Sequence, residues 1–285
     1  MFGFNERDLD AEATAILADY KHVIYEGFLE ALEEGVPRDA AAILVDEQFG
    51  SAIQNEARAR GITRILTVEK SGQDEFDFEY GADFGKHIEL FSPDYVKALV
   101  RYNPDEDAQM NKRQIEKLAV LNTFCHARGY AFLFELLVPS IAAQLEVCGG
   151  SEETYEKTMR AGLMKRAMAE LTAGGIEPDI WKLEGLESTE DMKSVAQQAQ
   201  SGGRTHVGIV VLGRGESDEK VRVWLGAASS VPGVIGFAVG RTVFKEPLLQ
   251  YHKKQKTREE AACAIADNYK RYVDLFEAAA RTGSL

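Results

Sequence analysis

Apolar runs of four to eight residues alternate along the chain with longer amphipathic segments. Short uninterrupted apolar runs are typical of strands buried on both faces of a parallel sheet. They occur at residues 43–46, 64–69, 98–102, 131–138, 180–184, 207–212 and 234–239. Between most of them, apolar residues recur every three or four positions, which predicts helices. These helices cover residues 11–34, 51–60, 107–128, 151–172, 189–200, 216–229 and 257–281.

The alternation of strand and helix predicts an α/β fold with a parallel sheet. No long linker or low-complexity segment divides the sequence, so we interpret residues 1–285 as a single domain. The number of repeats favours a (β/α)₈ TIM barrel, which typically needs about 250 residues. A dinucleotide-binding sheet is disfavoured because no GxGxxG motif follows a strand.

The predicted strands are one too few for a barrel of eight. The chain opens directly into the helix at residues 11–34, which should follow the first strand, so we expect that this strand is missing from this chain or that something irregular replaces it. The first and last of the remaining strands would then keep unpaired edges, which are templates for association. We expect residues 1–8, with Phe2 and Phe4 at strand spacing, or a neighbouring chain to fill the gap. Closure with seven strands is the remaining alternative.

The composition narrows the range of partners. Lys and Arg number 33 against 46 Asp and Glu, a formal charge of −13, which argues against nucleic-acid binding. The apolar runs are too short to span a membrane, and the acidic N-terminus is no secretory signal. Three distant cysteines favour a reduced, cytoplasmic setting, where we expect them to be buried fillers. We also expect a homo-oligomer and no cofactor.

The polar residues that could carry chemistry lie near the carboxyl ends of the strands, where barrel enzymes have their active sites. They are Asp46, Glu47, Glu69, Lys70, Arg101, Asn103, Glu135, Lys182, Glu184, Arg214 and Arg241. Because side chains alternate along a strand, Lys182 and Glu184 are predicted to point into the barrel. The same parity directs Glu135 inward and groups Lys97 with Arg101.

Lys182 is the candidate nucleophile. A lysine inside a barrel is unfavourable unless it is paired or reacts. A lysine of lowered pKa can attack a carbonyl and form a Schiff base. Lys97 or Arg101 would lower the pKa of Lys182, and Glu135 could transfer protons. The alternative is that Lys182 only forms an ion pair with Glu184 or Glu135.

The last two strands are each followed by Gly-Arg, at Gly213-Arg214 and at Gly240-Arg241. Barrels often bind phosphate at this place through backbone N–H groups, and arginine adds a fork of donors. The pattern therefore predicts a phosphate site that includes Arg214, Gly240 and Arg241. Alternatively, the two arginines neutralise nearby carboxylates.

The histidines show no HxH or HExxH spacing, so we predict no zinc site.

Two functions other than a Schiff-base enzyme are compatible with the sequence. A metal-dependent lyase could instead bind Mg²⁺ through carboxylates, with Lys182 as an electrostatic partner. Its candidate ligands are Asp46, Glu47, Glu69, Glu135 and Glu184. The third possibility is a non-catalytic barrel that binds a sugar phosphate.

Several long motifs resemble one known family. They are LVDEQFG (44–50), EKSGQDEFDFEYG (69–81), LVRYNP (99–104), FLFELLVP (132–139), PDIWKLEGLE (178–187), VLGRG (211–215) and GFAVGRTVF (236–244). The chain resembles the aldolase-like domain fused to 5-dehydro-2-deoxygluconokinase in bacterial inositol catabolism. It is more distantly similar to class I tagatose-bisphosphate aldolases. The Asp-His-Arg-like motif that this family carries on an earlier strand is absent here, in agreement with the count of seven strands.

The resemblance implies a (β/α)₈ barrel with Schiff-base aldol chemistry. Lys182 matches the Schiff-base lysine, Glu135 the acid/base glutamate and Lys97 a second active-site lysine. Arg241 falls in the phosphate-binding Gly-Arg. The implied substrate is a phosphorylated keto-sugar acid, 2-deoxy-5-keto-gluconate 6-phosphate, cleaved to dihydroxyacetone phosphate and malonate semialdehyde. The substrate contacts that we predict are Asp46, Glu69, Lys70, Arg101, Glu184, Arg214, Gly240 and Arg241.

Overall fold

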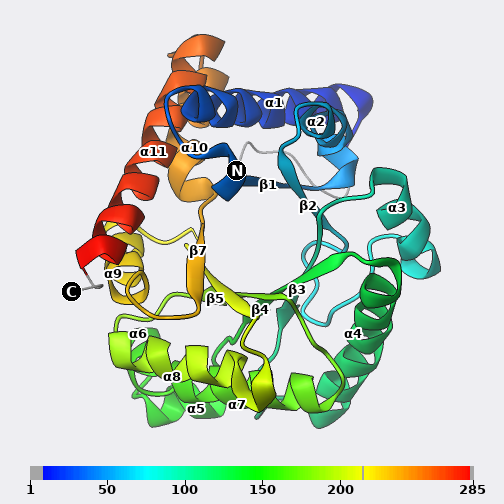
Figure 1. Cartoon of the computed structure of the whole chain (residues 1–285), viewed down its shortest axis with the longest axis vertical. Coiled ribbons are helices and arrows are strands. Elements are labelled where there is room, and N and C mark those ends of the chain that lie inside the picture. The colour runs from blue at the N-terminus through cyan, green and yellow to red at the C-terminus, as the bar shows by residue number, and fades with distance from the viewer. Residues whose placement is uncertain (1–8, 214, 283–285) are drawn as a thin grey trace.

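The computed structural model describes residues 9–213 and 215–282, which form one parallel sheet surrounded by helices (Figure 1). The strands follow one another across the sheet in chain order. They are β1 (Ala42–Val45), β2 (Thr63–Thr67), β3 (Tyr95–Arg101), β4 (Ala131–Leu137), β5 (Ile180–Glu184), β6 (Gly208–Leu212) and β7 (Val234–Ala238). All seven predicted strands are confirmed, with ends shifted by three residues or fewer.

The helices form an outer layer around the curled sheet (Figure 1). The longer ones are α1 (Ala11–Glu33), α2 (Glu47–Ala59), α4 (Ala108–Arg128), α7 (Arg160–Ala173), α8 (Thr189–Ala199), α9 (Asp218–Ala228), α10 (Arg241–His252) and α11 (Arg258–Thr282). The shorter ones are α3 (Phe84–Phe91), α5 (Ala142–Val147) and α6 (Glu152–Thr158). Side chains alternate as expected, since Phe134 and Trp181 are buried on the helix-facing side, with ring centroids 5.0 Å apart.

Local capping sets the helix ends. Asp10 accepts a hydrogen bond from the Ala13 N–H and begins α1, and Ser188 begins α8 in the same way. Gly129 ends α4 with φ of 75°, a left-handed conformation that glycine adopts without steric penalty.

Some helices depart from the sequence prediction. Helix α2 begins at Glu47 rather than at residue 51, because Asp46 caps it by accepting from the Phe49 N–H at 2.8 Å. Helix α10 was not predicted, because Pro247 lies inside it and proline opposes a helix interior. The short helices α3 and α5 were also missed. The helix predicted over residues 151–172 is divided into α6 and α7 at Met159.

The sheet formed by residues 9–213 and 215–282 is open: it is the curled seven-stranded half-barrel expected without the first strand, and not a closed (β/α)₈ barrel. Among the described residues, β1 pairs only with β2 and β7 only with β6, which also excludes closure with seven strands. Leu44 in β1 and Ile235 in β7 are 39% and 59% exposed. Outside the gap, α1 and α11 pack against each other, so the helical layer continues across it (Figure 1). Residues 1–8, the segment we expect to fill the gap, lie outside the described residues.

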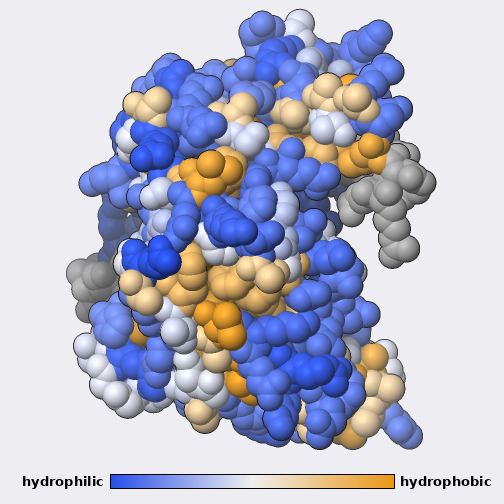
Figure 2. Space-filling view, turned by 90° about the vertical axis from the view of Figure 1, so that its right-hand side faces the viewer, coloured by the Kyte–Doolittle hydropathy of each residue, from blue (hydrophilic) through white to orange (hydrophobic). Residues whose placement is uncertain are grey.

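The surface is largely hydrophilic. Figure 2 shows the side of the molecule that carries α3 and α4, with apolar patches among hydrophilic residues. Leu90 on α3 and Val120 on α4 are exposed large hydrophobic residues. None of the described helices is long and apolar enough to cross a membrane. The homo-oligomer stays a prediction.

Alanine substitutions at two glycines, Gly27 and Gly226, test how closely the helices of the outer layer pack. A Cβ at Gly27 of α1 would lie 2.7 Å from the Ala262 carbonyl oxygen and 2.7 Å from Ile265 Cβ on α11. Gly27→Ala should therefore lower the free energy of unfolding by roughly 1–3 kcal/mol, the usual penalty of overpacking.

Gly226 in α9 is the matched control, since a Cβ there meets nothing within 4 Å. Gly226→Ala should raise stability by about 0.4–1 kcal/mol. Urea denaturation of both variants measures these changes. A Gly27→Ala protein as stable as the wild type would contradict the close approach of α1 and α11.

Candidate active site

Three neighbouring strands bring two lysines and a glutamate together inside the curled sheet. Glu135 in β4 lies opposite Lys182 in β5 in the strand register, and Lys97 projects from β3 on the other side of Glu135. The Oε2 atom of Glu135 lies 2.7 Å from Lys97 Nζ and 2.9 Å from Lys182 Nζ. Glu69, just after β2, continues the row with its Oε1 atom 2.5 Å from Lys97 Nζ. We call these four residues the lysine–glutamate cluster.

The cluster is largely shielded from water. The exposed fractions of the side chains are 5% for Lys97, 8% for Glu135, 12% for Lys182 and 14% for Glu69. Ionised groups removed from water are strongly destabilised unless opposite charges compensate them. Two carboxylates and two amines alternate here, so each charge faces an opposite one. The second oxygen of Glu69, Oε2, is buried and has no hydrogen-bond partner among the described residues.

The two lysines differ in protonation. Burial lowers the pKa of Lys182 below the ordinary lysine value, and Lys97 lowers it further, against the attraction of Glu135. Burial alone would also lower the pKa of Lys97, but Glu69 and Glu135 outweigh it and raise that pKa. Lys97 therefore stays a cation, whereas Lys182 loses its proton more readily.

Glu135 is held as an anion. Burial would raise its pKa, but Lys97 and Lys182 outweigh burial and lower it. The arrangement places a readily deprotonated amine beside a carboxylate that can take or return a proton. Amine attack on a carbonyl needs this combination.

A second polar feature lies where β7 leads into α10. Gly240 is the N-cap of α10, and Arg241 is its first residue. The Arg241 guanidinium lies against Gly215, whose φ of 77° is a left-handed conformation that favours glycine. The hydroxyl of Thr242 is buried without a hydrogen-bond partner among the described residues. A guanidinium, a hydroxyl and a helix N-terminus are a suitable set for an anion.

The other cations predicted as substrate contacts lie at the carboxyl end of the sheet. Arg101 donates to the Gln73 carbonyl at 2.9 Å and so supports the loop after β2. Lys70 on that loop is exposed. The aromatic part of the loop packs inward, with the ring of Phe78 stacked 4.2 Å from that of Phe84. Arg214 lies outside the described residues.

Two carboxylates predicted as substrate contacts have structural partners instead. Asp46 caps α2 and forms an ion pair with Lys21. Glu184 is completely buried, accepts from the Val138 N–H at 3.1 Å and lies 3.7 Å from Arg160. Their carboxylates are used to hold neighbouring elements together.

The carboxylates proposed as Mg²⁺ ligands do not meet at one point. Asp46 and Glu184 have the partners given above, and Glu47 binds His87 Nδ1 at 2.8 Å. Among residues 9–213 and 215–282, no group of three or more His, Cys, Asp or Glu could hold a metal ion. The geometry therefore does not favour the metal-dependent alternative.

Two residues of interest were missed by the sequence analysis. Thr242 follows Arg241 directly, and its buried hydroxyl is visible only in the fold. Arg160, on α7, is 2% exposed. In the sequence it is one of two arginines on the helix predicted over residues 151–172, so no local signal distinguishes it.

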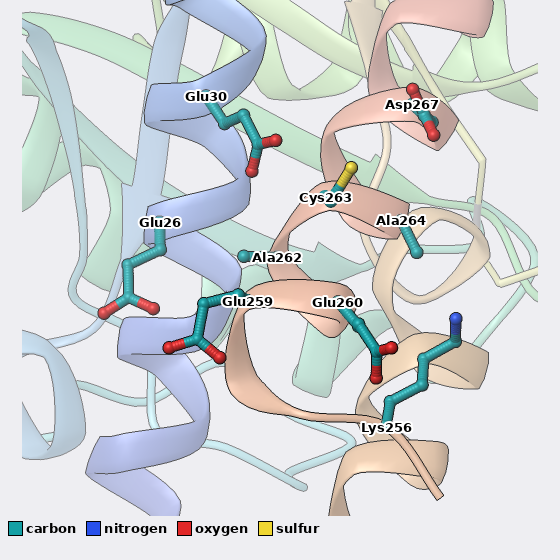
Figure 3. Close-up of a pocket in the computed structure, with 9 residues that line it drawn as sticks. All are labelled: Glu26, Glu30, Lys256, Glu259, Glu260, Ala262, Cys263, Ala264 and Asp267. Carbon is teal, nitrogen blue, oxygen red and sulfur yellow. The ribbon is translucent and has the colours of Figure 1, made fainter.

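A surface groove between α1 and α11 lies outside the lysine–glutamate cluster and is lined mainly by acidic side chains (Figure 3). Its lining includes Glu26, Glu30, Glu259, Glu260 and Asp267. Cys263 lies there as well and is exposed, so our expectation that all three cysteines are buried is wrong. Five carboxylates would repel an anionic substrate, so the phosphate site is not here.

The open, curled parallel sheet and its outer layer of helices define an α/β half-barrel, with the lysine–glutamate cluster in its interior. The chain belongs to the family described as "Uncharacterized protein conserved in bacteria (DUF2090)", whose model matches residues 5–280. It is also similar to the tagatose 1,6-diphosphate aldolases of Listeria monocytogenes and Listeria innocua. The identity to each is 27% over 165 residues, 56% of this chain. The chain spans about half of those relatives, since 47% of each is covered.

Solved structures show the same fold. Fructose-bisphosphate aldolase from Plasmodium falciparum has a TM-score of 0.59 at 12% identity, covering 94% of this chain and 96% of that one. The YdjI aldolase from Escherichia coli K12 has a TM-score of 0.55 at 13% identity, covering 89% and 87%. Cgl0159 from Corynebacterium glutamicum has a TM-score of 0.55 at 16% identity, covering 94% and 80%.

The protonation difference between the two lysines is open to a direct test. Only a neutral amine reacts with acetic anhydride, so the labelling rate of a lysine rises with pH through its pKa. Burial lowers the pKa of Lys182. The labelling rate of Lys182 should therefore reach its plateau at a lower pH than the labelling rate of a reference peptide lysine, whose pKa is about 10.4. Lys97 should still be unlabelled where Lys182 reacts.

Competitive labelling followed by peptide mass spectrometry gives both curves. The variant Lys97→Met removes the neighbouring cation and frees Glu135 for Lys182 alone, so the Lys182 curve should move to higher pH. A Lys182 curve at or above that of the reference lysine would contradict the proposed charge distribution.

Proposed function

We propose that this protein is a class I aldolase that cleaves a phosphorylated keto-sugar acid through a Schiff base on Lys182. The observation that carries the proposal is the sharing of one carboxylate, Glu135, between a lysine of lowered pKa and a lysine of raised pKa. The names of the curated relatives support aldol chemistry.

In the first step, neutral Lys182 attacks the substrate ketone. The carbonyl oxygen takes up protons and leaves as water, and the product is an iminium ion on Nζ. Glu135 lies 2.9 Å from that nitrogen and can carry the protons. Lys97 keeps its charge and holds Glu135 in place at 2.7 Å.

In the second step, the bond breaks between the carbon attached to the iminium carbon and the next carbon along, which carries a hydroxyl group. A carboxylate, Glu135 in this proposal, takes the proton of the hydroxyl on the far carbon, which becomes an aldehyde. The bonding electrons move to the iminium nitrogen and give an enamine. Protonation of the enamine and hydrolysis release the ketone product and restore Lys182.

Arg241, Thr242 and the α10 N-terminus would hold the phosphate of the substrate. The substrate that we propose from the resemblance is 2-deoxy-5-keto-gluconate 6-phosphate, with dihydroxyacetone phosphate and malonate semialdehyde as products. This substrate is anionic at both ends. Lys70 and Arg101 lie on the β2–β3 side of the site and are the candidates for its carboxylate.

Borohydride trapping identifies the nucleophile. Wild-type protein is incubated with 2-deoxy-5-keto-gluconate 6-phosphate, dihydroxyacetone phosphate or tagatose 1,6-bisphosphate and reduced with borohydride. Peptide mapping should find the adduct on Lys182. Lys182→Ala should lose both the adduct and turnover, while its circular dichroism spectrum stays that of the wild type.

The matched control is Lys112→Ala, which removes an exposed lysine from α4 and should change neither result. An adduct that persists in Lys182→Ala would assign the nucleophile to Lys97 or Lys70. Binding of a sugar phosphate with neither adduct nor turnover would favour the non-catalytic barrel.

Arg241→Ala tests the phosphate site. Binding of the phosphorylated substrate should weaken by roughly 1.5–3 kcal/mol, the contribution of a charged hydrogen bond, whereas binding of the unphosphorylated analogue should change little. Isothermal titration calorimetry measures both. Equal losses for the two ligands would mean that Arg241 has only a structural role.

A further inference from the structure

A buried ion pair lies at the carboxyl end of β5, the strand that carries Lys182. Glu184 is the last residue of β5, two positions after Lys182, and has no exposed surface. Its carboxylate lies 3.7 Å from the guanidinium of Arg160, the first residue of α7, which is 2% exposed. Arg160 also pairs with Glu156 of α6 at 2.9 Å.

This pair holds the backbone at the carboxyl ends of two strands. Glu184 accepts a hydrogen bond from the N–H of Val138, the residue after β4, at 3.1 Å. Arg160 donates to the carbonyl of Gly185, the residue after β5, at 3.0 Å. The carbonyl of Val138 is held as well, because the Tyr155 hydroxyl donates to it at 2.9 Å.

The residue after β5 packs closely against α9. A Cβ at Gly185 would lie 2.3 Å from the Trp224 ring of α9, so the backbone contacts that indole directly. The Arg160 guanidinium lies 5.5 Å from the centre of a Trp224 ring. The ends of both strands are therefore enclosed by α6, α7 and α9.

Stability alone does not account for this pair. Removing two charges from water costs several kcal/mol, and an apolar pair of similar volume is often as stable or more so. The contacts of Glu184 and Arg160 are instead directional, and they end on the two residues that follow the strands carrying Glu135 and Lys182.

We propose that Arg160 and Glu184 are positioning residues, which hold the ends of β4 and β5 so that Glu135 stays within proton-transfer distance of Lys182. The inference rests on the proposed Schiff-base function and adds to it the part of the fold that sets its geometry. Proton transfer needs a separation near the 2.9 Å seen between Glu135 and Lys182.

The test compares two buried arginines, one at the carboxyl ends of the strands that carry the site and one at the opposite, amino end of the sheet. Arg160→Met removes the positioning pair. Arg64→Met makes the same change at the amino end of β2, where a 6% exposed arginine donates to the Phe91 and Ser92 carbonyls. Both variants lose a buried arginine with backbone acceptors, so both should lose thermal stability.

Only Arg160→Met should lose catalysis. Its single-turnover cleavage rate in the folded protein should fall about 10- to 100-fold, because small displacements of reacting groups slow a reaction by such factors. KM and the equilibrium yield of borohydride adduct on Lys182 should stay close to the wild type. Glu184→Gln retains an acceptor for the Val138 N–H and should be faster than Glu184→Ala.

The outcomes separate the two proposals. No adduct in the wild type would overturn the Schiff-base function and this inference with it. An adduct in the wild type, with equal cleavage rates in Arg160→Met and Arg64→Met, would leave the proposed function intact and overturn the inference. Equal rates in Glu184→Gln and Glu184→Ala would also overturn it, since the hydrogen bond to Val138 would then have no effect.

Discussion

One carboxylate shared by two amines is the interaction on which the candidate site depends. Glu135 lies within 3 Å of Lys97 and Lys182, and all three side chains are shielded from water. Glu69 forms an ion pair with Lys97, so Lys97 is paired with two carboxylates, whereas Lys182 is paired with Glu135. As a consequence, the pKa of Lys97 is raised and Lys97 keeps its charge, whereas the pKa of Lys182 is lowered and Lys182 loses its proton more readily.

The charge of the cluster also bears on the proposed anionic substrate. With Lys182 neutral, one cation faces two carboxylates, so the interior carries a net negative charge. An anionic substrate would be repelled there unless its charged ends stay outside the cluster. In the proposed function, Arg241 on the β7 side and Arg101 with Lys70 on the β2–β3 side are the candidates to bind those ends. The reacting ketone could then approach Lys182 while the charged groups stay near the carboxyl ends of the strands.

Much of this arrangement could be predicted from the sequence, because it depends on periodicity. Short apolar runs identify all seven strands, and the alternation of side chains directs Lys97, Glu135 and Lys182 to one face. The partner of Glu184 could not be predicted in this way. Side-chain alternation directs Glu184 inward like Lys182, but its carboxylate pairs with Arg160, which comes from a helix distant in the sequence. Helix α10 was missed because Pro247 argues against a helix locally, although tertiary packing accommodates it. Sequence pattern also predicts seven strands with unpaired edges on the first and the last, and among the described residues β1 and β7 do not pair with each other. What fills the gap could not be predicted, because periodicity carries no information on residues outside the repeating elements.

The most direct test of the account is a crystal structure of the protein after borohydride reduction in the presence of a ketose phosphate. The account predicts continuous electron density from Lys182 Nζ to the former carbonyl carbon. It also predicts that Glu135 stays within hydrogen-bond distance of both that nitrogen and Lys97. Density that joins the ligand to Lys97, or a ligand bound without any covalent bond, would contradict it.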